Sequence, residues 1–95
     1  MSIALELNIL NMCRRKLAMV KSIVSGEQDD VALSLAKRHQ VHKKDAIREM
    51  VIAHGSAIDD FLSVILEGDS GFSETSQLEL RAMAKEFSSL TASIY

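Results

Sequence analysis

Apolar residues recur every three or four positions through most of the chain, and glycines fall where this repeat stops. In the first segment the repeat ends at Ser25 and Gly26. Its members are Leu10, Cys13, Leu17, Val20 and Val24. This spacing places one apolar stripe along a helix of 3.6 residues per turn. The chain has no proline, so helix is permitted throughout. The pattern predicts a first helix over residues 3–24.

The same repeat predicts three further helices, over residues 28–40, 44–67 and 74–93. The third is long, and its repeat continues across Gly55. We expect one helix with a kink near Gly55, although Ser56 and Asp59 have capping-box spacing and leave a break and restart open. The sequence therefore predicts an all-α protein, a small bundle of about four helices forming one domain over residues 1–95.

The last helix carries a narrow apolar row. Its members are Leu80, Met83, Phe87, Leu90 and Ile94. Such a row is typical of a helix that packs against one partner helix. A 95-residue core also has a thin margin of stability, which association can widen. We therefore predict a homodimer with this row in the interface, and a monomeric bundle is the alternative.

Charge is distributed unevenly along the chain. Residues 1–48 hold nine Lys and Arg against five Asp and Glu, whereas residues 49–95 hold two against eight. Opposite halves of this kind suit an antiparallel contact between two copies. The candidate partner-binding cations are Arg14, Arg15, Lys16, Lys37, Arg38, Lys43, Lys44 and Arg48. They suit a phosphate-bearing or acidic partner, but cations at helix ends also stabilise the helix dipole, and that interpretation is favoured.

The stretch LAKRHQVHKKDAIREMV, residues 35–51, resembles the helix–turn–helix half of the ribbon-helix-helix DNA-binding family. Ala36-Lys37-Arg38 matches the end of the family's first helix, and Ile47-Arg48-Glu49 matches the opening of its second. The resemblance implies a dimeric DNA-binding regulator that contacts nucleic acid through residues 37–48. It is the alternative to a protein-binding function.

Three residues depart from that family's pattern. Gln40 stands where glycine is usual, and His42 and Lys44 replace the usual serines. The resemblance also requires a strand at residues 19–25, where apolar and polar residues alternate poorly. No aromatic residue lies among the cations, which removes the base-stacking mode of single-strand binding.

No motif indicates catalysis. Cys13 lies on the apolar stripe of the first helix, where buried thiols are inert. Asp59 and Asp60 are adjacent, so on a helix they diverge by ~100° and cannot act as a close carboxylate pair. No glycine-rich phosphate loop is present. We expect neither an enzyme nor a bound cofactor.

The histidines give weak support for a metal site. His39, His42 and Asp45 follow one another at steps of three, which on one helix would gather two imidazoles and a carboxylate. Nothing in the spacing supplies the further ligand that a structural zinc ion requires. His54 falls within the apolar stripe of the third helix, and we expect a core residue that is hydrogen-bonded to a carbonyl or hydroxyl. We expect no metal.

The remaining expectations concern location and partner. No apolar run approaches the ~18 residues that span a bilayer, and the first ten residues are a poor secretory signal. A single cysteine fits a reducing cytoplasm. We expect a cytoplasmic adaptor from a bacterium or phage that binds another protein, of the inhibitor, antitoxin, anti-activator or chaperone type.

Overall fold

The computed structural model describes residues 2–67 and 71–94, which form four α-helices. They are α1 (Ile3–Val24), α2 (Asp29–His39), α3 (Lys43–Glu67) and α4 (Glu74–Ala92). No strand occurs among these described residues. The predicted all-α bundle is confirmed, and no helix in the described part is long and apolar enough to cross a membrane.

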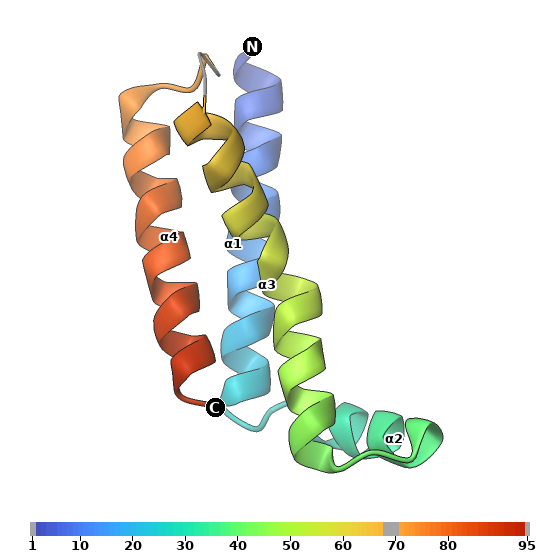
Figure 1. The fold of residues 1–95 in the computed structure, drawn as a ribbon. Coiled ribbons are helices and arrows are strands. Elements are labelled where there is room, and N and C mark those ends of the chain that lie inside the picture. Colours follow the sequence, from blue (N-terminus) through green and yellow to red (C-terminus); the bar gives the residue numbers. More distant parts are fainter. Residues whose placement is uncertain (1, 68–70, 95) are drawn as a thin grey trace.

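Three of the helices form the body of the molecule. α1 and α4 run in the same direction, and α3 runs antiparallel to both (Figure 1). The shorter α2 packs against the first half of α3, makes little contact with the other two helices, and projects from one end of the bundle (Figure 1). The α2–α3 pair is therefore a helical hairpin with one side of α2 open to solvent.

Serine side chains cap two of the helices. The Ser2 hydroxyl accepts a hydrogen bond of 3.1 Å from the amide of Leu5 at the start of α1. The Ser73 hydroxyl accepts one of 3.3 Å from the amide of Ser76 at the start of α4. Each bond satisfies an amide that has no partner within its helix.

α1 and α2 end in the same kind of turn. A residue with a left-handed backbone stands shortly after each helix end: Gly26, two positions after Val24, with φ 92°, and Gln40, directly after His39, with φ 57°. The amide of the next residue donates to a carbonyl five positions earlier, at 2.9 Å from Glu27 to Ser22 and at 3.0 Å from Val41 to Ala36. This is the Schellman arrangement, and glycine is its usual residue. At the position where the sequence departs from the ribbon-helix-helix pattern, Gln40 therefore adopts a conformation that favours glycine.

α3 runs through Gly55 without a break, as expected for the favoured single helix, and the alternative of a restart at Ser56 does not occur. Gly55 is buried against α4. A Cβ atom added to it would lie 2.0 Å from Cε1 of Phe87. The glycine therefore serves a close approach between two helices rather than a break in one.

The apolar row of α4 faces the chain's own core. Leu80, Met83 and Phe87 are buried, and Leu90 and Ile94 are half-buried against the same cluster. α1 and α3 cover most of this row, so little of its surface is left to contact a second copy. This packing leaves the homodimer a prediction and gives its placement on this row less support.

The ribbon that the DNA-binding resemblance requires is absent. Residues 19–24 belong to α1, and Val20 and Ile23 are buried in the bundle core. The resemblance at residues 35–51 therefore does not extend to the fold.

Candidate functional site

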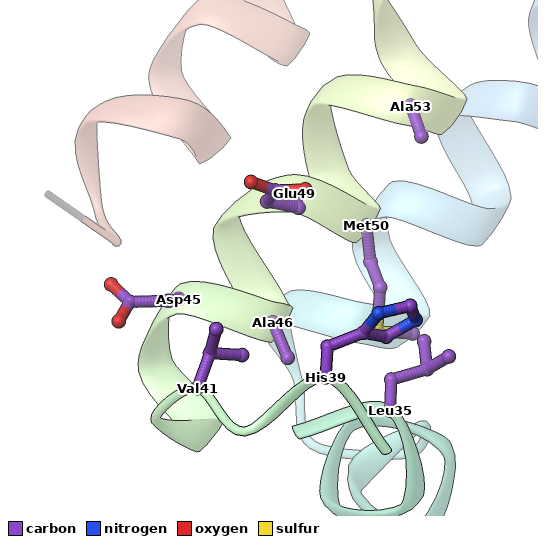
Figure 2. Close-up of a pocket in the computed structure, with 8 residues that line it drawn as sticks. All are labelled: Leu35, His39, Val41, Asp45, Ala46, Glu49, Met50 and Ala53. Carbon is purple, nitrogen blue, oxygen red and sulfur yellow. The ribbon is translucent and has the colours of Figure 1, made fainter. Parts of the chain in front are cut away.

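A hollow of about 400 Å³ lies between α2 and α3 (Figure 2). α2 contributes two residues, the α2–α3 turn contributes one, and the first half of α3 contributes the rest. The lining residues are Leu35, His39, Val41, Asp45, Ala46, Glu49, Met50 and Ala53. We call this cavity the α2–α3 hollow.

Small residues set the spacing of the two helices. α2 buries Ala32 and Ala36, and the facing part of α3 buries Ala46. Alanine allows close approach of two helices, but it fills little of the space to either side of the contact line. The hollow lies on one side of that line, next to Leu35 on α2.

The floor of the hollow is apolar and partly open to water. The Met50 side chain extends from α3 toward the α2 side, where Leu35 and His39 lie (Figure 2). Val41 lines the hollow from the turn and is 46% exposed. Val31 precedes Leu35 by one helical turn on the same face of α2 and is also 46% exposed. These exposed valines continue the apolar surface out of the hollow.

The charged residues that line the hollow are acidic, and a cation lies beside it on α2. Asp45 and Glu49 lie one turn apart on the α3 wall. On α2, Arg38 follows Leu35 by three positions, so it lies beside this lining residue on the helix surface without lining the hollow itself. Arg38 and Glu49 are both exposed, and neither forms an ion pair within residues 2–67 and 71–94. Asp45 lies 3.5 Å from Arg48.

Three of the eight predicted partner-binding cations hold the fold together. Both Nε and Nη2 of Arg14 donate to the carboxylate of Glu79 on α4, with a closest distance of 2.6 Å. Lys43 forms a 2.8 Å ion pair with Asp29, which ties the start of α3 to α2. The Nε of Arg48 donates to the carbonyl of Ile94 at 3.2 Å, beside the end of α4.

The other five cations do not form one patch. None of them has an ion pair among the described residues: Arg15, Lys16, Lys37, Arg38 and Lys44. Arg15 and Lys16 lie in the middle of α1, ~14 Å of helix before its end. Lys37, Arg38 and Lys44 surround the α2–α3 turn at the far end of the bundle. The sequence allowed the cations of α1 and those around the α2–α3 turn to form one patch, but the structure places the two sets apart.

The uneven charge of the two halves is partly neutralised inside the chain. In addition to the Arg14 pair, Lys21 of α1 lies 2.7 Å from Glu86 of α4. Both partners advance by seven residues from one pair to the next, as expected for two parallel helices in register. Part of the charge asymmetry is therefore taken up by ion pairs within the chain, and the asymmetry gives less support to a dimer than the sequence indicated.

The thiol and the imidazoles form no reactive site. Cys13 is fully buried, and burial raises the pKa of its thiol, which keeps it protonated. The turn after His39 separates it from Asp45, and no group of three metal-ligating residues occurs in the described part of the chain. His54 is half-buried, and it lacks the expected hydrogen bond to a described residue.

The hollow itself escaped sequence reasoning. Val31 and Leu33 are among the apolar residues of α2, but both are more than 40% exposed. Periodicity indicates which face of a helix is apolar and not how many neighbours cover it. The sequence did hold one signal that α2 would have an open side, namely its shortness. An 11-residue helix cannot extend along a bundle of three longer helices.

The chain matches no protein-family profile, and the comparisons with curated proteins and with solved structures gave no match. Its function is therefore inferred from its own residues.

Proposed function

We propose that this chain is a small cytoplasmic regulatory or adaptor protein that binds another protein in the α2–α3 hollow and performs no catalysis. An inhibitor, antitoxin, anti-activator or chaperone would act in this way. The observation that supports the proposal is the projecting hairpin, whose open side combines exposed apolar side chains with charged walls.

The chemistry of the hollow suits a protein segment. Helical grooves of this kind accept apolar side chains of a partner helix, and charged residues on the rim set its orientation. Met50 at the floor has a flexible, polarisable side chain that can adapt to different partners. The lining offers no buried nucleophile and no cluster of metal ligands among the described residues.

Affinity capture with matched variants tests this proposal. Ala53 lines the hollow and is exposed, so Ala53→Arg obstructs the hollow without burying a charge. Ser63→Arg places the same side chain on an exposed position of the same helix, ~15 Å further along. Proteins captured by the unmodified chain and by Ser63→Arg are expected to be lost with Ala53→Arg. An identical set captured by all three forms contradicts the use of the hollow.

Nucleic-acid binding is the second candidate function. Lys37, Arg38 and Lys44 are exposed around the α2–α3 turn and have no ion pair among the described residues. The nearby Asp45 and Glu49 would repel phosphates. Gel-shift measurements on duplex DNA at two salt concentrations test this function, because phosphate contacts make affinity fall steeply with salt.

A further inference from the structure

We propose that a second copy of this chain occupies the α2–α3 hollow, so that two chains form a two-fold dimer through their hairpins. The inference rests on the proposed use of the hollow as a protein-binding site, and it names the partner. It also replaces the α4 row with a different interface.

The apolar surface around the hollow fits this occupant. Val31 and Val41 are large side chains left nearly half exposed on either side of Leu35. In one chain α2 has α3 as its main neighbour, so its open flank lacks a covering helix. A second hairpin laid across the hollow supplies that helix and converts two helical pairs into a four-helix contact.

The charges make the surface complementary to itself. A two-fold axis through the hollow exchanges the α2 flank of one copy with the α3 flank of the other. Arg38 on the first flank then faces Asp45 and Glu49 on the second, and the same contact occurs twice. A partner that carried only positive charge would suit Asp45 and Glu49 but would be repelled by Arg38.

The contrast with other charges in the chain strengthens this argument. Arg14 and Lys21 each meet a carboxylate of their own chain within 2.7 Å. Glu49 lines the hollow and Arg38 lies beside its lining residue Leu35, yet neither forms an ion pair with the other or with another described residue. The dimer gives each of them a partner across the interface.

The expected association is weak. Two short stretches of helix from each copy make an interface at the low end of the sizes seen for specific complexes. We expect the mass measured by sedimentation equilibrium to rise from monomer toward dimer between ~10 µM and ~1 mM protein at low salt. High salt should shift this transition to higher concentration, because the pairs on the rim are accessible to screening ions.

Charge exchange provides the decisive experiment. Arg38→Glu and Glu49→Arg change exposed positions, and circular dichroism should confirm that both variants fold. Each variant alone places like charges across the interface, so its dimer dissociation constant should rise at least ~10-fold. A mixture of the two variants should form a heterodimer more readily than either variant forms a homodimer, because residues 38 and 49 are then opposite in sign in both contacts. The double variant should dimerise more tightly than either single variant, although the glutamate at position 38 then also faces the unchanged Asp45, and Arg15→Glu, away from the hollow, should have no effect.

The outcomes separate this inference from the proposed function. A monomer mass at every concentration overturns the dimer. A dimer whose dissociation constant is unchanged by both charge exchanges also overturns it, and so does a mixture of the two variants that fails to associate. If a foreign protein is then captured by the unmodified chain and lost with Ala53→Arg, the proposed function stands with a different occupant. If Ala53→Arg changes neither dimerisation nor capture, both proposals fail.

Discussion

The ring of Phe87 on α4 packs against the backbone of Gly55 in the middle of α3. A Cβ atom at residue 55 would lie 2.0 Å from Cε1 and 2.5 Å from two other ring carbons, which is closer than such atoms can approach. Phe87 is 6% exposed, so its ring has little room to move. A glycine within a helix costs ~1 kcal/mol relative to alanine. Here that cost is offset by the burial of an aromatic ring against the helix backbone.

This contact predicts that Gly55→Ala lowers stability. The gain in helix propensity is ~1 kcal/mol, whereas forcing the ring out of its position costs ~1–3 kcal/mol. We expect a net loss of up to ~2 kcal/mol in the free energy of unfolding, measured by urea denaturation. Ser56→Ala, on the adjacent exposed position, is the control and should be near neutral.

A double-mutant cycle identifies the ring as the cause. Phe87→Leu alone should destabilise the chain by leaving a cavity, but Gly55→Ala should cost less in that background because the smaller side chain makes room for the Cβ. Equal costs in both backgrounds would argue against the contact. Phe87→Asp places a charge in the monomer's core, so we expect it to unfold the chain rather than to convert a dimer into a folded monomer.

The same pair shows how far the sequence alone could lead. The apolar repeat placed the helices correctly, because a stripe at 3.6 residues per turn needs no knowledge of its neighbours. It also selected Phe87 and its row as a surface that must be covered. It could not show whether α1 and α3 or a second chain provides the cover, because that depends on how the helices pack in space.

Charge was more difficult to interpret than the apolar pattern. Arg14 appeared as one of a basic trio, and its bidentate contact with Glu79 joins residues 65 positions apart, a distance at which no local spacing rule applies. The hollow was hidden for the same reason. It depends on Val41 in a turn and Glu49 on the next helix, which become neighbours only after α2 folds back on α3.

The turn after α2 predicts a stabilising substitution. Gln40 has a φ of 57°, where a side chain costs ~1 kcal/mol that glycine does not incur. Gln40→Gly should therefore raise the free energy of unfolding by up to ~1 kcal/mol. The matching turn after α1 supplies the control: Gly26→Ala, at φ 92°, should lower it by a similar amount. A loss of stability in Gln40→Gly would mean that the side chain has a role that outweighs the strain.

We predict that the thiol of Cys13 reacts slowly with a disulfide reagent in the folded protein. The thiol is fully buried and its pKa is raised by burial, so little thiolate is present or accessible near neutral pH. A disulfide reagent should label Cys13 at the rate at which the chain unfolds, many-fold more slowly than in urea. Gly55→Ala should accelerate labelling and Gln40→Gly should slow it, if both change the population of open molecules as predicted. Labelling as fast as in the unfolded chain would show that the first helix is not packed as described.

Asp59 predicts a dependence of stability on pH. Its pKa is raised, first by partial burial and second by the neighbouring Asp60 carboxylate. In the pH range above the usual aspartate value of ~3.9, the folded chain therefore binds more protons at this site than the unfolded chain. The stability contributed by this site is present below pH ~4 and is lost as the pH rises through the raised pKa.

Asp59→Asn mimics the protonated form, so at pH 7 it should stabilise the chain by a few tenths of a kcal/mol, a small figure because the side chain is exposed and screened. The gain should disappear below pH ~4, where the unmodified Asp59 is itself protonated. Asp60→Asn removes only the second cause and should give a smaller gain. Thermal melts of the three proteins at pH 3.5 and pH 7 measure these differences, and a destabilised Asp59→Asn at pH 7 would reverse the sign argued here.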